Sequence, residues 1–181
     1  MLKSLVILLR PQQWLKNLFV LAPAFFAGSF LVADVLRDSL LTFIIFSAAA
    51  STVYIFNDWI DRQADSKHPE KRTRPIASGQ ISGKIALITG LLTLLMSMLM
   101  GLSFLNFEVI AITGSYLVLN LAYTLILKNI AILDVSCIAT GFVLRLFAGS
   151  EATGIELSSW IITLTFLLAL FLALAKRRDD V

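Results

Sequence analysis

Six long apolar stretches in a chain of only 181 residues constrain its fold more than any other feature of the sequence. They cover roughly residues 14–33, 39–56, 85–105, 109–127, 130–149 and 159–175. A helix needs about 20 residues, at 1.5 Å each, to cross a bilayer core of about 30 Å, and slightly shorter helices cross with little tilt. The runs are continuous and do not alternate, which excludes a membrane β-barrel. The sequence therefore predicts an all-α, polytopic transmembrane helix bundle with six spans.

Composition excludes a water-soluble globule. The chain is 58% hydrophobic and 15% charged, whereas soluble domains average about 45–50% and 25%. So many apolar side chains exceed what one small core can hide. The net charge of +3 reflects loop lysines and arginines and does not indicate nucleic-acid binding. The single cysteine and single histidine exclude an internal disulfide and a clustered histidine site.

The positive charges are distributed very unevenly between the two sides of the predicted bundle. Of the 15 lysines and arginines, 13 precede or open the first stretch, lie between stretches two and three or four and five, or follow the last. The positive-inside rule assigns that side to the cytoplasm. We therefore predict that both termini and the loop 57–84 are cytoplasmic.

The start of this loop carries a run of acidic residues. Asp58, Asp61 and Asp65 continue from the second apolar stretch without a helix breaker. Their i, i+3, i+7 spacing places all three on one face of a continuing helix, where they repel one another unless a cation lies among them. Mg²⁺ prefers oxygen ligands, usually one or two carboxylates plus substrate phosphates. The spacing therefore indicates a metal–diphosphate site at the membrane surface.

Basic residues follow the acidic run at once. They are Lys67, His68, Lys71, Arg72 and Arg74. Carboxylates for a metal and cations for phosphate oxygens form the two halves of a diphosphate clamp, so we favour this interpretation. The alternative is a solvated acidic helix end in which Asp65 pairs with Arg62 or Lys67. For His68 itself, local hydrogen bonding is the expected role.

Two charged residues fall inside the fifth apolar stretch, where charge is costly. Asp134 lies one turn into it, and Arg145 lies about three turns further on a similar face. For Asp134 the alternatives are a surface pair with Lys128 or a second metal or sugar contact. For Arg145 we expect a buried partner or a lipid phosphate. Tyr123, in the preceding stretch, is expected to line a cavity on the inner face of the bundle together with these residues.

Several motifs together resemble a known family. Asn57-Asp58-x-x-Asp61-x-x-x-Asp65 is similar to the first aspartate-rich motif of the UbiA superfamily of intramembrane prenyltransferases. Two further stretches resemble its decaprenyl-phosphate phosphoribosyltransferase branch: Arg10-Pro11-Gln12-Gln13-Trp14-x-Lys16-Asn17 and Gly141-Phe142-x-x-Arg145-x-x-Ala148-Gly149. The resemblance covers nearly the whole chain.

The resemblance implies a fold and an activity. The family is a nine-helix bundle, so residues 1–181 are expected to form one UbiA-type domain, lacking about its last third, with residues 57–84 as its catalytic loop. The implied reaction moves a 5-phosphoribosyl group from phosphoribosyl diphosphate to a polyprenyl phosphate and releases diphosphate. It implies a multi-pass protein of a bacterial or archaeal plasma membrane. The expected partners are the two substrates and the membrane, with no nucleic acid, and a homo-oligomer is allowed.

The resemblance also implies roles for individual residues. Mg²⁺ is expected on Asp58, Asp61 and Asp65, with Asn57 orienting the site. Lys67, Lys71 and Arg74 are expected to contact the donor's phosphates, and Lys16 and Arg10 the lipid phosphate. The expected ribose contacts are Tyr123 and Asp134, and Arg145 is a further candidate for substrate binding.

Two other functions stay open at the level of the sequence. A UbiA-type enzyme can instead move a prenyl chain from a prenyl diphosphate to an aromatic acceptor. Many such enzymes carry a second DxxxD motif, whereas here Asp134 stands alone, which disfavours this alternative. The chain can also be a non-catalytic bundle or an inactive fragment.

Overall fold

A computed structural model describes residues 2–179, without the side chains of residues 131, 178 and 179. Five of its helices are long and apolar enough to cross a membrane. They are α3 (Ala33–Lys67), α4 (Gly83–Phe104), α5 (Phe107–Leu125), α6 (Ala131–Thr153) and α7 (Ser159–Asp179). The prediction of an all-α membrane helix bundle is confirmed, and the chain is a multi-pass membrane protein.

The first predicted span differs from the prediction because it is not one continuous helix. The chain begins with α1 (Leu2–Leu9), continues as the 3₁₀ helix η1 (Pro11–Leu21) and then forms the short helix α2 (Ala22–Phe26). Prolines near the start of η1 and of α2 punctuate the segment. A 3₁₀ run of 11 residues is unusually long. Tertiary contacts with α3 and α6 hold it in place.

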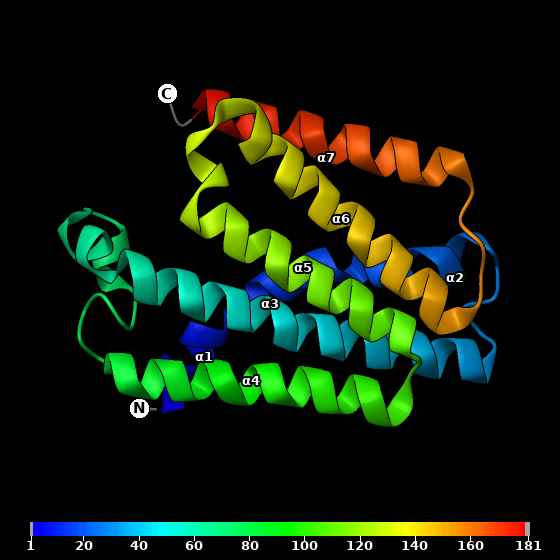
Figure 1. Cartoon of the computed structure of the whole chain (residues 1–181), viewed down its shortest axis with the longest axis horizontal. Helices are drawn as coiled ribbons and strands as arrows, with labels where there is room; N and C mark the ends of the chain where they lie inside the picture. Colours follow the sequence, from blue (N-terminus) through cyan, green and yellow to red (C-terminus); the bar gives the residue numbers. More distant parts are fainter. Residues whose placement is uncertain (1, 180–181) are drawn as a thin grey trace.

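The long helices pack mainly against their neighbours in sequence. Figure 1 shows α4 alongside α3, with α6 and α7 as an antiparallel pair on the other side of the bundle. Helix α3 is central, because it also contacts α1, η1, α5 and α6. The end of α3, the start of α4 and the end of α7 lie at the same end of the bundle. We refer to this end, which carries the acidic run, as the charged end.

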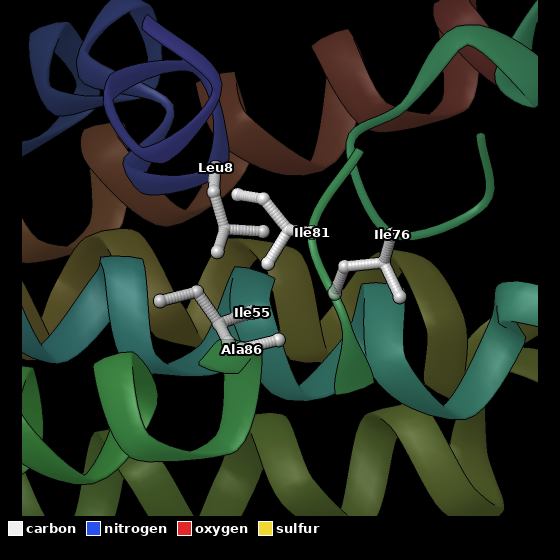
Figure 2. Close-up of a cluster of buried hydrophobic side chains, with 5 residues drawn as sticks. All are labelled: Leu8, Ile55, Ile76, Ile81 and Ala86. Carbon is white, nitrogen blue, oxygen red and sulfur yellow. The ribbon is translucent and has the colours of Figure 1, made fainter. Parts of the chain in front are cut away.

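An apolar cluster anchors the loop between α3 and α4 at the charged end (Figure 2). Two loop residues, Ile76 and Ile81, are buried against Leu8 of α1, Ile55 of α3 and Ala86 of α4. Burying an isoleucine side chain stabilises a fold by about 1.5–3 kcal/mol. The loop backbone is therefore held against α3, next to the last two turns of that helix. The short 3₁₀ helix η2 (Lys71–Thr73) lies within it.

A second apolar cluster fixes η1 against the long helices. Val20 of η1 packs with Phe46 of α3, Tyr116 of α5 and Ala148 of α6. The backbone of η1 approaches α6 so closely that a Cβ on Gly149 would lie 1.9 Å from the Val20 carbonyl oxygen. A small residue at this position is what allows the contact.

Candidate active site at the charged end

Helix α3 runs without interruption through the whole acidic run. It ends at Lys67, so the prediction that the acidic residues continue the second apolar helix is confirmed. The side chains of Asp58 and Asp65 are almost completely buried, at 3% and 6% exposure, whereas that of Asp61 is 29% exposed. The three carboxylates therefore lie in two different surroundings.

One guanidinium group joins two of these carboxylates. Arg74 donates from Nη1 to Asp65 Oδ2 at 2.7 Å and to Asp58 Oδ1 at 3.1 Å. Its backbone is positioned by the apolar cluster that holds the following loop residues. Asp58 and Asp65 thus face each other across a single cationic nitrogen.

A second guanidinium group completes the shell around Asp58. Arg10 donates from Nη2 to both oxygens of Asp58, at 2.6 and 2.9 Å. Arg10 precedes η1 in the left-handed conformation, with φ of 52°, which is uncommon for a residue with a side chain. Its guanidinium also lies over the Tyr54 ring, 5.2 Å from the centroid. The turn between α1 and η1 therefore directs Arg10 toward the acidic end of α3.

Asp61 has a different partner. Lys128, in the 3₁₀ helix η3 (Leu127–Asn129) between α5 and α6, donates to both Asp61 oxygens at 3.1 and 3.2 Å. Among the described residues, the structure shows no group of three His, Cys, Asp or Glu side chains able to hold a metal ion. The structure brings Asp58 and Asp65 together and leaves Asp61 apart.

Other predictions for the loop have mixed outcomes. The alternative partners for Asp65, namely Arg62 and Lys67, are wrong, because Arg62 donates to the Trp59 carbonyl and Asp65 pairs with Arg74. His68 accepts local backbone hydrogen bonds at Nδ1, as predicted. Within the segment 57–84, three predicted site residues make no side-chain hydrogen bond or ion pair with any described side chain; they are Asn57, Lys67 and Lys71.

Asp134 belongs to a separate network that links three helices. Tyr123 of α5 donates to Asp134 Oδ1 at 2.9 Å, and Arg177 of α7 pairs with Asp134 Oδ2. The alternative of a surface pair between Asp134 and Lys128 is wrong, because Lys128 contacts Asp61. Tyr123 and Asp134 do lie together, joined by this hydrogen bond.

Arg145 lies deeper in the bundle and is 5% exposed. It donates to Asn17 Oδ1 at 2.8 Å, to the Gly141 carbonyl at 2.6 Å and to the Tyr116 hydroxyl at 3.2 Å. Its guanidinium also lies over the rings of Tyr116 and Phe142. The expectation of a buried partner is confirmed, and the partners within the described chain are neutral.

Sequence reasoning missed the residues that fix η1 to α3. Asn17 is fully buried and donates to Ser47, while Trp14 donates to Ser51, which itself donates to the Leu9 carbonyl. Buried polar groups need such partners to offset their desolvation. The sequence held one signal for this network: Asn17 places a polar amide within an apolar stretch. This network determines where the flanking residues of η1 point.

An apolar groove runs between the η1–α2 segment and α7. It consists of two cavities, of about 970 and 260 Å³, which share Phe19, Thr165 and Leu168 as lining residues. The larger one continues toward Phe25 and Trp160, at the end of the bundle away from the acidic run. The groove follows α7 along most of its length.

Lys16 lies at the opposite end of this groove, where it lines the smaller cavity. It belongs to η1 and not to one of the five long helices. Withdrawal of its ammonium from water lowers the pKa of Lys16, and repulsion from Arg145, Lys176 and Arg10 lowers it further. No carboxylate within the described residues pairs with it. An anion at this position would relieve the repulsion among these cations.

The donor set at Asp58 and Asp65 fits a divalent cation bound together with phosphates. Two carboxylate oxygens already lie within hydrogen-bonding distance of one shared cation. Mg²⁺ takes oxygen ligands and typically uses one or two carboxylates plus substrate phosphates. Arg10 and Arg74 supply the guanidinium groups that bind phosphate oxygens in pairs.

Comparisons with known proteins agree on one family. The model of the UbiA prenyltransferase family matches residues 18–180. Decaprenyl-phosphate phosphoribosyltransferase from Corynebacterium glutamicum is 36% identical over 178 residues, which cover 96% of this chain and 53% of that protein. The protein of the same name from Mycolicibacterium smegmatis is 37% identical over 182 residues, covering 98% of this chain and 57% of that one. The chain spans about half the length of these curated relatives.

Among solved structures, a UbiA homolog from Archaeoglobus fulgidus bound to DMAPP and Mg²⁺ is similar, with a TM-score of 0.77 and 22% identity. The match covers 92% of this chain and 60% of that one. It supports the same arrangement of helices.

Proposed function

Because the chain belongs to the UbiA prenyltransferase family, we propose that it transfers a 5-phosphoribosyl group from phosphoribosyl diphosphate to a polyprenyl phosphate. The observation that carries this proposal is a juxtaposition. A carboxylate pair flanked by two arginines lies at the end of α3, and Lys16 lies nearby at the polar end of an apolar groove. The first suits a metal-bound diphosphate, and the second suits a lipid phosphate with its hydrocarbon chain.

The donor would bind at the charged end. Asp58 and Asp65 would hold Mg²⁺, which, when bound, offsets the negative charge of the departing diphosphate. Arg74 would donate to the phosphate oxygens, joined by the exposed side chains of Lys67 and Lys71. Preorganised donors of this kind are usually the largest contribution to catalysis. Asn57 and Asp61, at the same helix end, would orient the site.

The acceptor would bind with its phosphate at Lys16 and Arg10. Its oxygen forms a bond to the anomeric carbon of the ribose as the bond from that carbon to the diphosphate oxygen breaks. The lipid phosphate is already ionised at neutral pH, so this step needs no strong general base. Tyr123 and Asp134 are the proposed ribose contacts. Arg145 would act through Asn17, by fixing the segment that carries Lys16.

The same proposal includes an orientation. The charged end carries most of the lysines and arginines, and such residues are concentrated on the cytoplasmic side of membrane proteins. We therefore place both termini and the loop 57–84 in the cytoplasm, in a bacterial or archaeal plasma membrane. Water-soluble phosphoribosyl diphosphate would then reach the site directly.

Membranes that contain the 181-residue chain test this function directly. They are incubated with radiolabelled phosphoribosyl diphosphate, polyprenyl phosphate and Mg²⁺, and the lipids are extracted. We expect a labelled lipid that disappears when Mg²⁺ is chelated. A parallel incubation contains a labelled prenyl diphosphate and an aromatic acceptor. Transfer of the prenyl chain there, with no phosphoribosyl lipid in the first incubation, would assign the chain to the other chemistry of its family. Absence of both products would contradict the proposal for this chain.

Lys16→Gln should raise the KM for polyprenyl phosphate about 10- to 100-fold, because a hydrogen bond to a charged group contributes about 1.5–3 kcal/mol. The KM for phosphoribosyl diphosphate should stay near the wild-type value. Lys3→Gln, which removes an exposed lysine of α1, is the matched control. An equal loss for both substrates would argue against a specific role for Lys16.

The pH dependence gives an independent test of Lys16. Its pKa lies below the ordinary lysine value of 10.5, so the charge is present at lower pH and is lost as pH rises through the shifted pKa. Lipid binding should therefore decline on the alkaline side earlier than an unperturbed lysine would predict. Lys16→Arg keeps its charge at all these pH values and should move the decline to higher pH. An unchanged profile would contradict the assignment.

A further inference from the structure

The acidic end of α3 already contains its own counter-ions. The single nitrogen Nη1 of Arg74 lies between Asp58 and Asp65, and Arg10 covers both oxygens of Asp58. We propose that Arg74 holds these two carboxylates in the arrangement of a metal site while it occupies the position of the cation. Divalent metal and diphosphate then bind strongly only together. This inference rests on the proposed function.

The contacts explain why the metal alone binds weakly. Asp58 Oδ1 accepts hydrogen bonds from both arginines, and its side chain is only 3% exposed. A divalent ion held by both Asp58 and Asp65 displaces Arg74 from both carboxylates, including the 2.7 Å contact with Asp65. The displaced guanidinium would stay near a doubly charged ion without an anionic partner, which is strongly unfavourable in partly buried surroundings.

A diphosphate removes this conflict. Its oxygens accept hydrogen bonds from guanidinium groups in pairs and also serve as metal ligands. When it binds, Arg74 exchanges its carboxylate partners for phosphate oxygens, and the freed carboxylate oxygens become available to the metal. Each ligand therefore raises the affinity for the other by the same factor. Free metal does not assemble the site without substrate.

The local fold allows this exchange without refolding of the loop. The backbone after Arg74 is fixed by the buried side chains of Ile76 and Ile81 (Figure 2). The Arg74 side chain is 27% exposed, so it can change rotamer at the surface. Only the end of the side chain needs to move from one anion to the other.

The experiment measures Mn²⁺ binding by electron paramagnetic resonance, with the full 181-residue chain in detergent. Mn²⁺ replaces Mg²⁺ because its free and bound forms are distinguishable. Wild-type protein should bind Mn²⁺ weakly, and Arg74→Gln should bind Mn²⁺ alone about 5- to 150-fold more tightly, the usual range of a coupling between two ligands. If Arg74 had a purely structural role, its replacement would disorder the carboxylates, and the Mn²⁺ affinity would fall.

Two control variants separate the specific contact from net charge and from folding. Arg62→Gln makes the same change in charge at the same end of the bundle, on α3, but among the described residues Arg62 contacts Trp59 and no aspartate, so the Mn²⁺ affinity of this variant should stay near wild type. Arg74→Lys keeps the charge and should also bind Mn²⁺ weakly. Each variant is first checked for a single symmetric peak in size-exclusion chromatography.

Radiolabelled diphosphate completes the test. Wild-type protein should retain it at least about 5-fold better with Mn²⁺ than with chelator, and Arg74→Gln should lose most of this dependence. Tight Mn²⁺ binding by wild type without diphosphate would overturn the inference, as would weaker Mn²⁺ binding by Arg74→Gln. Either result leaves the proposed function intact if labelled lipid still forms. Absence of labelled lipid despite coupled binding would instead remove the proposed function.

Discussion

Asp58→Asn is expected to reduce phosphoribosyl transfer by at least about 10²-fold, the size of effect seen when one preorganised charge-stabilising group is removed from an active site. Asp58 is the carboxylate with the most contacts at the charged end, since it accepts from Arg10 twice and from Arg74 once. The change removes a proposed metal ligand and leaves two partly buried arginines without their shared anion. Initial rates of labelled lipid formation measure the loss.

Asp61→Asn is the matched control for this prediction. Its partner Lys128 is 31% exposed, and Asp61 itself is 29% exposed. Such half-exposed pairs contribute only about 0.2–1 kcal/mol to stability, so the fold should tolerate the change. Transfer should fall less than in Asp58→Asn. An equal loss in the two variants would show that all three aspartates act as one ligand set. It would contradict the separation of Asp61 from the pair formed by Asp58 and Asp65.

Gly149→Ala is expected to destabilise the bundle by about 3 kcal/mol, the upper end of the range for overpacking. The new Cβ would lie 1.9 Å from the Val20 carbonyl oxygen, and a backbone atom cannot rotate away as a side chain can. The η1 segment must therefore move off α6, which also displaces the buried hydrogen bonds of Asn17. A thermal melt in detergent, followed by circular dichroism, measures the effect.

Gly114→Ala provides the comparison for Gly149→Ala. It lies in the middle of α5, and a Cβ there would meet nothing within 4 Å. Since alanine favours a helix over glycine by about 1 kcal/mol, this variant should melt at or above the wild-type temperature. If the two variants melt alike, the close approach of η1 to α6 is not what holds this segment.

The glycines also illustrate how much the sequence could predict. From the sequence alone, the small residues Gly141, Gly149 and Gly154 favour close helix packing. This is confirmed for Gly149, and Gly141 lies against Arg145 and Tyr116. It is wrong for Gly154, which ends α6 in the left-handed conformation with φ of +67° and has no atom near its Cβ position. Sequence identifies a small residue but does not say whether space or backbone conformation requires it.

The candidate site shows the same contrast between what the sequence predicts and what only the fold decides. The sequence by itself determined the apolar stretches, the continuation of α3 through the acidic run and the charge asymmetry, because hydrophobicity and helix continuation depend on residues close together in the chain. Only the tertiary structure decided which cation faces which carboxylate. Asp61 pairs with Lys128, 67 residues away, and Asp58 with Arg10, 48 residues away. Such pairs depend on how whole helices pack, and no local spacing encodes that.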